Sequence, residues 1–326
     1  MKSILVTGGA GYIGSHVVQQ LTARGERVVV LDNLSTGFRE AVRDAKLVVG
    51  DVGDAGLVRE TITAHDVDTV MHFAAHTVVP ESVRDPLKYY GNNTCATRSL
   101  LASCVATGVA HFVFSSTAAV YGMPASGVAD EDTPTAPINP YGTSKLMSEM
   151  MLRDVCAATP MKSVVLRYFN VAGCDPAGRI GQSTRNATLL IKVACEHAVG
   201  KRERLAIFGT DYDTPDGTCI RDYIHVDDLA SAHLRALDYL RGGGASVTLN
   251  CGYGHGYSVR EVLSTVQRIS GRRLNIVEEP RRPGDPPALI ARSDRLKALL
   301  KWEPRYDDLD IIVKTALAWE ARQVPA

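Results

Sequence analysis

Tyr141 and Lys145 are the residues whose types and spacing most directly suggest chemistry. They stand four positions apart at the start of a predicted helix, Tyr141 to Ala158, so both side chains project from one face of it. A phenol, with a pKa near about 10, is a poor base at neutral pH, but a nearby ammonium group and a helix N-terminus favour the phenolate. Lowering that pKa by about three units requires roughly 4 kcal/mol. The pair therefore predicts proton abstraction by a tyrosine.

The same spacing also fits an ordinary surface helix, because a chain with 12 tyrosines can match Tyr-x-x-x-Lys by chance. The preceding segment favours chemistry. A predicted strand, His111 to Ser115, runs into Ser116 and Thr117, whose hydroxyls could bind a substrate oxygen beside the phenol. Thr117 could instead be a strand-end hydroxyl that bonds only to backbone.

A second signal is the run from Ile4 to Gly14, ILVTGGAGYIG. An apolar strand, a glycine turn and a helical pattern follow one another in the order of a dinucleotide site. Gly8 and Gly9 permit a sharp turn, and Gly11 lets the backbone approach a pyrophosphate. Gly14 lets the helix pack closely on the strand, and the free N–H groups of the helix N-terminus bind the anion. The alternative is a turn that only reverses the chain.

Asp32 favours the dinucleotide interpretation. It follows the apolar run Val28 to Leu31, about twenty residues after the glycine turn. At this spacing a carboxylate can accept hydrogen bonds from both ribose hydroxyls of adenosine. No arginine stands beside it, and its charge would repel a 2′-phosphate, so NAD is favoured over NADP. The alternative role for Asp32 is that of an ordinary turn residue.

The elements that must position these residues alternate along the chain. The predicted strands are Ile4–Val6, Val28–Leu31, Lys46–Val49, Thr69–Phe73, His111–Ser115 and Val164–Tyr168, and further helices are predicted at Asp54–Ala64 and Asp85–Thr107. Short connections between them predict an α/β fold, a doubly wound parallel (Rossmann) sheet with right-handed crossovers. Ligands are then expected beyond the carboxyl ends of the strands.

Beyond about Val171 this alternation is lost, and loops rich in Gly and Pro separate shorter helices. We expect an NAD-binding Rossmann domain over residues 1–170, to which residues 222–253 return through a strand at Val247–Asn250. Residues 171–221 and 254–326 are expected to form a second, smaller α/β substrate domain.

The composition excludes several classes of protein. Hydrophobic residues make up 45% and charged residues 22% of the 326 residues, and Lys plus Arg equals Asp plus Glu at 36 each. Neither nucleic acid nor a membrane is therefore expected as a partner. The predicted strand at the N-terminus leaves no room for a signal peptide, and 7 scattered cysteines fit a reduced cytoplasmic protein. The 9 histidines show no ligand spacing, so no metal is expected.

The glycine turn, the hydroxyl run before Tyr-Gly and Tyr141-x-x-x-Lys145 resemble the extended short-chain dehydrogenase/reductase superfamily. Longer segments are similar to its UDP-glucose 4-epimerase family over nearly the whole chain. They are LDN at 31–33, HFAA at 72–75, LRYFN at 166–170, LAIFGTDYDTPDGTCIRDYIHVDDLA at 205–230 and RRPGD at 281–285.

The resemblance implies bound NAD and reversible C4 epimerisation of UDP-glucose and UDP-galactose through a 4-keto sugar, as in galactose metabolism. The C4–H of a hexose is not acidic, so C4 cannot be inverted by simple proton exchange. Oxidation to a ketone makes the inversion possible. Tyr141 would take the proton of the 4-hydroxyl, and Lys145 would hold the nicotinamide ribose and lower the tyrosine pKa. Thr117 would hydrogen-bond the reacting oxygen.

The resemblance also implies the binding residues. The cofactor set is Gly8, Gly11, Tyr12, Ile13, Gly14, Asp32, Asn33, Asp51, Val52, Phe73, Ala74, Ala75, Asn92, Ser115, Tyr141, Lys145 and Tyr168. The UDP-hexose set is Thr117, Tyr141, Asn170, Leu190, Arg221, Arg282 and Asp285. The two arginines would bind the diphosphate as guanidinium forks and Asp285 the uridine ribose. A homodimer is implied through the helices that begin at Asp85 and Tyr141, although apolar positions such as Met147 and Met150 also fit core packing.

Three positions depart from the family pattern. Thr77 stands where some members carry lysine, and Leu189 where others have Asn or His. Leu289 gates the sugar pocket, where tyrosine excludes N-acetyl sugars and a small residue admits them. Leucine is intermediate, so a UDP-N-acetylglucosamine 4-epimerase or a dual-specificity enzyme stays open.

Two rival functions remain. A sugar-nucleotide 4,6-dehydratase needs an acidic pair beside the reactive hydroxyl, but Ala118 and Ala119 follow Thr117 here. A non-catalytic NAD-binding regulator is disfavoured by the intact Tyr141, Lys145 and Thr117.

Overall fold

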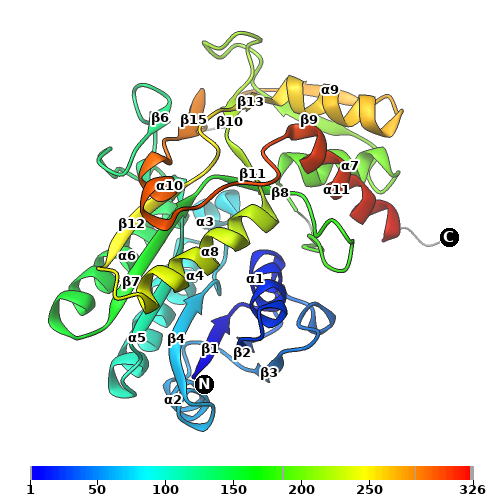
Figure 1. Cartoon of the computed structure of the whole chain (residues 1–326). Coiled ribbons are helices and arrows are strands. Elements are labelled where there is room, and N and C mark those ends of the chain that lie inside the picture. The colour runs from blue at the N-terminus through cyan, green and yellow to red at the C-terminus, as the bar shows by residue number, and fades with distance from the viewer. Residues whose placement is uncertain (1, 186, 283, 324–326) are drawn as a thin grey trace.

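A seven-stranded parallel sheet organises the larger part of the molecule (Figure 1). The structure is a computed structural model that describes residues 2–185, 187–282 and 284–323. The strand order is β12-β7-β5-β4-β1-β2-β3. The strands are β1 (Ser3–Thr7), β2 (Arg27–Asp32), β3 (Lys46–Val49), β4 (Val67–His72), β5 (His111–Thr117), β7 (Lys162–Tyr168) and β12 (Val247–Cys251). The predicted doubly wound parallel sheet is confirmed, and all six predicted strands are present.

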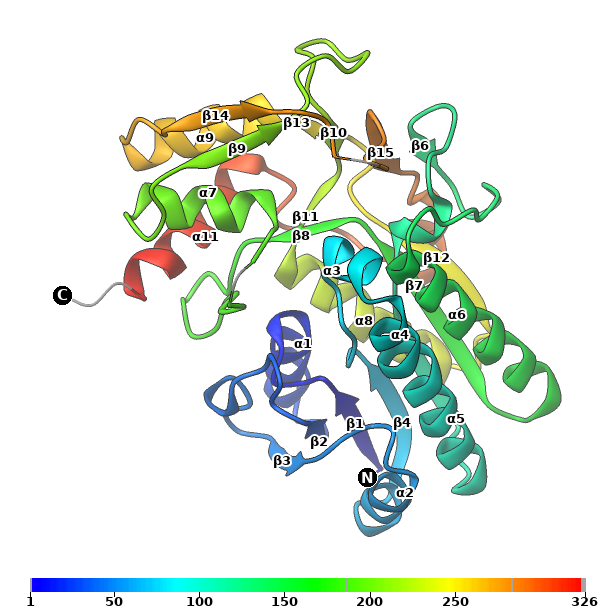
Figure 2. The same cartoon turned by 180° about the vertical axis from the view of Figure 1, so that it is seen from behind.

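The alternation of side chains in β1 explains why helices cover both faces of the sheet. Ile4 and Val6 point to the face covered by α1 (Tyr12–Ala23) and α8 (Val226–Arg241). Leu5 points to the opposite face, which is covered by α2 (Ala55–Ala64), α5 (Ala96–Ala106) and α6 (Pro140–Ala158) (Figure 2). A strand buried on both faces therefore reads as a continuous apolar run.

The helix predicted over 85–107 is interrupted. Asp85 caps its start by accepting from the Lys88 N–H at 3.2 Å, but α4 (Pro86–Tyr89) passes into a π-helical turn, η2 (Tyr90–Cys95), before α5 begins. Within η2 the buried Asn93 amide accepts from the His76 N–H at 2.8 Å and donates to Ser144 Oγ at 3.0 Å. The predicted helix is therefore present over its length but contains an irregular π-helical turn, which places this amide between two neighbouring segments.

The strand predicted at Val247–Asn250 does return to the main sheet, because β12 pairs in parallel with β7. The remaining strands form a four-stranded sheet, β13-β10-β15-β6, and two pairs, β8 with β11 and β9 with β14. Their bounds are β6 (Val128–Ala129), β8 (Asn170–Ala172), β9 (Leu205–Phe208), β10 (Ile220–Arg221), β11 (Tyr223–His225), β13 (Tyr257–Ser258), β14 (Ile276–Glu279) and β15 (Ala288–Ala291). The division into two domains at the stated boundaries stays a prediction.

The other helices are short or lie in the C-terminal part of the chain. They are η1 (Arg39–Ala41), α3 (Val79–Arg84), η3 (Ala118–Tyr121), α7 (Leu190–Ala198), α9 (Val259–Ser270), α10 (Asp294–Leu300) and α11 (Leu309–Arg322). Figure 1 shows α7, α9 and α11 beside β9, away from the main sheet. Among the described residues, no helix has both the length and the apolar character needed to cross a membrane.

Candidate active site

The first turn of α6 places Tyr141 beside the end of β5. Asn139 caps the helix by accepting from the Gly142 N–H at 2.9 Å, and Pro140 is its first residue. A Cβ on Gly142 would lie 2.6 Å from the Ala119 carbonyl oxygen, so glycine lets α6 approach η3 closely. Tyr141 is 8% and Lys145 3% exposed, which excludes the surface-helix alternative.

Lys145 crosses from α6 to the end of β5. Its Nζ donates to the Ser115 carbonyl oxygen at 2.9 Å and lies 4.9 Å from the centre of the Phe114 ring. Burial lowers the pKa of Lys145 to about 8, and the negative charge of Glu149 opposes that shift. The ammonium is therefore held in place but is close to losing its proton at mildly alkaline pH.

The phenol of Tyr141 is affected in the opposite direction. Burial raises the pKa of Tyr141 above its ordinary value, whereas a hydrogen bond with the Thr117 side chain lowers it. Burial is the larger effect, so the protein alone keeps this phenol protonated at neutral pH. A lowered pKa caused by Lys145 stays a prediction for the enzyme with its cofactor.

Thr117 has the backbone role that was considered as its alternative. It ends β5 and caps η3, and its Oγ1 accepts from the Ala119 N–H at 3.1 Å. The same side chain is close enough to Tyr141 to lower the pKa of the phenol, and its contact with a substrate oxygen stays a prediction. Thr117 thus lies between the phenol and the end of β5. The next residue, Ala118, is buried in η3, so the acidic residue that a dehydratase needs is absent at this position.

Ser115 and Tyr168 complete this group of side chains. Adjacent strands β5 and β7 bring the Ser115 hydroxyl within 2.5 Å of the Tyr168 hydroxyl. Burial raises the pKa of the Tyr168 phenol, so this second tyrosine remains neutral. The structure therefore brings together Tyr141, Lys145, Thr117, Ser115 and Tyr168 at the carboxyl edge of the sheet.

The glycine turn forms a cradle that side chains would fill. Gly8 has a φ of +71°, and a Cβ there would lie 2.5 Å from the Ala74 nitrogen. A Cβ on Gly14 would overlap the Gly8 carbonyl oxygen. Gly11 is the N-cap of α1 and makes no side-chain capping bond, so the first N–H groups of the helix suit an anion. These features fit the pyrophosphate of a dinucleotide.

Asp32 hydrogen-bonds the backbone near the glycine turn and can still accept further hydrogen bonds. Its two carboxylate oxygens accept from the Ala10 N–H at 2.9 Å and the Leu34 N–H at 2.8 Å, which leaves lone pairs for ribose hydroxyls. Asp51 similarly accepts from Asn33 Nδ2 at 3.0 Å. Asp32 is therefore both a turn residue and a suitable ribose acceptor.

The other predicted cofactor residues lie around this cradle. The Phe73 N–H donates to the Thr7 carbonyl oxygen at 2.9 Å, which carries the pairing of β1 with β4 beyond the end of β4. The Tyr12 hydroxyl donates to the Gly173 carbonyl oxygen at 2.6 Å, so its side chain ties α1 to the segment after β8. Ile13, Ala74, Ala75 and Asn92 are half-buried, Val52 is buried, and Thr77 is exposed.

A second group of predicted residues lies on β10, β15 and the segment before β15. Arg221 Nη1 donates to the Pro286 carbonyl oxygen at 2.8 Å, and its Nη2 lies 3.4 Å from Asp285 Oδ1. The Arg282 guanidinium lies 3.7 Å from the centre of the Phe208 ring. Leu289 is paired with Arg221 across the two strands. Pro283, inside the RRPGD motif, lies outside the described residues.

Asn170 and Leu190 lie at the starts of β8 and α7, and both are half-buried, whereas Leu189 is exposed. Asp222 was not predicted from the sequence, and it links Asn170 to the residues on β10 and β15. Its carbonyl oxygen accepts from the Asn170 N–H at 2.9 Å, and its N–H donates to the Leu289 carbonyl oxygen at 3.3 Å. A carboxylate directly after Arg221 in an otherwise apolar run was the available signal.

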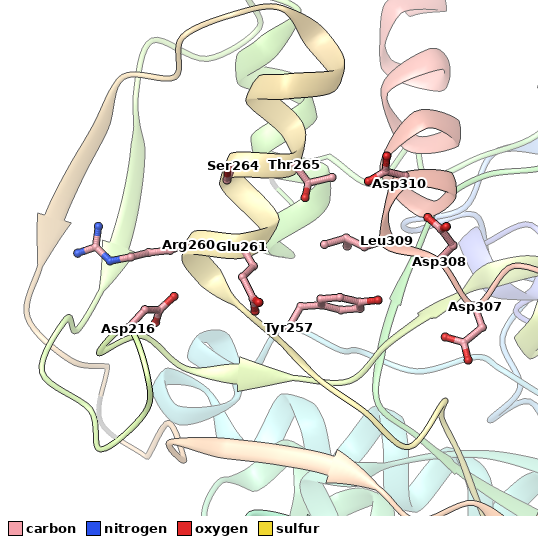
Figure 3. Close-up of a pocket in the computed structure, with 10 residues that line it drawn as sticks. All are labelled: Asp216, Tyr257, Arg260, Glu261, Ser264, Thr265, Asp307, Asp308, Leu309 and Asp310. Carbon is pink, nitrogen blue, oxygen red and sulfur yellow. The ribbon is translucent and has the colours of Figure 1, made fainter.

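A separate hollow lies between α9 and the start of α11, with five carboxylates among its lining residues (Figure 3). None of the residues predicted from the sequence lines it. Asp216 accepts from the Thr218 N–H at 2.8 Å, and Asp307 pairs with His255 at 2.7 Å, so part of this charge serves the local fold. The described residues hold no group of His, Cys, Asp or Glu arranged for a metal.

Comparisons with known proteins identify the family. Residues 4–252 match the NAD dependent epimerase/dehydratase family. UDP-glucose 4-epimerase from Azospirillum brasilense is 59% identical, over 97% of this chain and 91% of that protein. The structure of UDP-glucose 4-epimerase from Brucella ovis in complex with NAD matches with a TM-score of 0.96 and 44% identity, over 98% of this chain and 99% of that one.

The UDP-Glc/GlcNAc 4-epimerase from Campylobacter jejuni is also similar, with a TM-score of 0.87 and 50% identity over 99% of this chain and 100% of that one. Both the matched sequence and the matched structures extend over the glycine turn, Tyr141 and Lys145. The chain therefore belongs to the NAD dependent epimerase/dehydratase family, in the group whose members are named UDP-glucose 4-epimerase.

Proposed function

We propose that this chain interconverts UDP-glucose and UDP-galactose by reversible, NAD-dependent epimerisation at C4, through a 4-keto sugar. The observation that carries the proposal is the buried group at the end of β5, where the Thr117 side chain lowers the pKa of the Tyr141 phenol and Lys145 Nζ donates to the Ser115 carbonyl oxygen. The names of the relatives supply the substrate class.

The residues of the chain supply the acid–base part of this chemistry. Tyr141 removes the proton of the 4-hydroxyl as the alcohol is oxidised and returns it when the ketone is reduced. Thr117 hydrogen-bonds the reacting oxygen, and Lys145 provides the positive charge that favours the phenolate. The glycine turn, Asp32 and Lys145 would hold NAD, which would supply reversible hydride transfer when bound.

Inversion requires the keto sugar to present its other face to the same residues. The pyranose must therefore turn while the nucleotide stays bound. Arg221 and Arg282 would hold the diphosphate, a task that suits guanidinium groups, and Asp285 would bind the uridine ribose. Asn170 and Leu190 would contact the sugar end.

Leu289 favours a second activity, the epimerisation of N-acetylated UDP-hexoses. It is half-buried on β15 opposite Arg221, and the relative from C. jejuni at 50% identity is named a UDP-Glc/GlcNAc 4-epimerase. Turnover of UDP-N-acetylgalactosamine beside UDP-galactose tests this directly. Leu289→Tyr should lower the N-acetyl activity selectively, and an equal loss on both substrates would contradict the assignment.

The test of the main proposal uses purified protein without added cofactor. Denaturation should release NAD, and incubation with UDP-galactose should produce UDP-glucose. Bound NAD with no conversion of any sugar nucleotide would support a non-catalytic regulator instead. Formation of a 4-keto-6-deoxy product would indicate the dehydratase.

We further propose a homodimer in the cytoplasm. Leu87 is 79% exposed, and Met147 and Met150 on the outer face of α6 are 43% and 47% exposed, whereas Leu146 and Met151 pack against the core. Core packing therefore explains only part of the apolar stripe. All seven cysteines are free thiols, which is consistent with a reducing compartment.

A further inference from the structure

Glu149 and Arg167 form a buried ion pair directly behind the reacting side chains. Glu149 lies one helical turn after Lys145 on α6 and is 7% exposed, and Arg167 on β7 is 8% exposed. Arg167 Nη2 donates to Glu149 Oε2 at 2.6 Å, and Arg167 Nε donates to Oε1 at 3.1 Å. The Ser116 hydroxyl also donates to this carboxylate. Three strong donor groups thus fix one carboxylate.

The pair connects several elements around the site. Arg167 Nη1 donates to the Tyr121 hydroxyl oxygen in η3 at 3.0 Å, and Tyr121 in turn donates to Asn250 Oδ1 in β12 at 2.7 Å. Ser116 lies between Ser115, whose carbonyl holds Lys145, and Thr117, whose side chain lowers the pKa of Tyr141. The hydrogen bond from Ser116 to Glu149 therefore helps to fix the positions of both Ser115 and Thr117.

Fold stability alone does not explain this arrangement. Removing two charges from water is costly, and buried ion pairs can often be replaced by apolar side chains with no loss of stability. The Glu149 carboxylate, however, joins Ser116 at the end of β5 to α6, the helix that carries Tyr141 and Lys145. A positioning role accounts for a charged group at this point.

We propose that Glu149 and Arg167 are positioning residues for the epimerisation. They hold the end of β5 against α6 and place a negative charge one turn from the Lys145 ammonium. This inference rests on the proposed function. Neither residue was identified from the sequence.

The charged and titratable groups around Lys145 support the proposal that Glu149 stabilises the Lys145 cation. Glu149 from α6 and His72 from β4 interact electrostatically with Lys145. From β7, Arg167 pairs with Glu149, and Tyr168 hydrogen-bonds the side chain of Ser115, whose carbonyl holds Lys145. His72 is uncharged, because burial lowers its pKa to about 3. Glu149 is the group that stabilises the Lys145 cation against burial.

The test compares Glu149→Gln with Glu320→Gln. Glu320 also forms a buried ion pair, with Lys192 between α11 and α7, and is 1% exposed, so its variant controls for the loss of a buried charge. Turnover of UDP-galactose by the NAD-loaded enzymes is measured from about pH 6 to 10. In Glu149→Gln the alkaline fall of kcat should move to lower pH, with a loss of about 10-fold or more near pH 8. Glu320→Gln should keep the wild-type profile.

Glu149→Asp separates charge from position, because it should retain the alkaline limb but lower kcat at every pH. Hydrogen exchange gives a readout that does not depend on activity: Glu149→Gln should speed exchange over residues 115–121 and 141–145, and Glu320→Gln should not. Parallel pH profiles together with unchanged exchange would overturn the inference. An inactive wild type would refute the proposed function, and the exchange result would still decide the positional part.

Discussion

At the scale of residues, burial acts against both charges that the mechanism needs. It raises the pKa of Tyr141 and lowers the pKa of Lys145 to about 8, so neither the phenolate nor the ammonium is favoured by the apolar surroundings. Specific partners offset this effect: Thr117 for the phenol and Glu149 for the ammonium. The reactivity of the site thus depends on a few polar contacts.

The pKa of Lys145 predicts the alkaline limit of activity. Its cation is present below pH 8 and lost above it, so kcat should fall as the pH rises through about 8. Measurement of kcat for UDP-galactose against pH, with saturating substrate, checks this. A kcat that stays constant to about pH 10 would show that the charge of Lys145 is not required.

The sequence predicted the reacting residues but not their supports. Tyr141, Lys145 and Thr117 follow from a helix start and a strand end that are recognisable locally. Glu149 and Arg167 meet only because α6 and β7 pack together, and Asp222 acts through backbone groups of distant loops. Contacts between elements leave no local pattern, so the roles of Glu149 and Arg167 could not be predicted.

At the scale of elements, two helix starts carry the site. The glycine turn and α1 were predictable because the glycines allow a backbone conformation and a close approach that a side chain would prevent. The π-helical turn over Tyr90–Cys95 was not predicted; it contains Asn93, whose side chain bonds to His76 and Ser144 in other segments. Local helix propensity cannot predict a contact between residues that are distant in the sequence.

Gly14→Ala tests the cradle. The new Cβ would overlap the Gly8 carbonyl oxygen, a backbone atom that can move only if the turn changes shape, so the purified variant should lose most of its bound NAD. Gly91→Ala is the matched control, since its Cβ would meet no atom within 4 Å. NAD released on denaturation is measured for both. Full NAD content in Gly14→Ala would show that close approach at this turn is unnecessary.

At the scale of the whole molecule, the main sheet could be predicted almost completely, whereas the C-terminal part could not. The strands of the four-stranded sheet, β6, β10, β13 and β15, are only two to four residues long and pair across large sequence separations. Such segments are too short for a periodic pattern. Their role is nevertheless clear, because pairing of β10 with β15 brings Arg221 beside Leu289.

The proposed homodimer gives a prediction at this scale. Met150→Glu on α6 should shift the protein toward the monomer, because it places a charge in an apolar interface. Light scattering after size-exclusion chromatography measures the mass. Met123→Glu, at a residue 57% exposed beyond η3, is the control and should not change it. If both variants have the wild-type mass, the outer face of α6 is not the interface.

The central claim is that the Tyr141 phenol moves the proton of the sugar hydroxyl. Tyr141→Phe keeps the ring in its buried place and removes only that oxygen. This variant should retain NAD, but its kcat for UDP-galactose should fall by at least about 100-fold. A Tyr141→Phe enzyme with bound NAD and a near-normal kcat would contradict it.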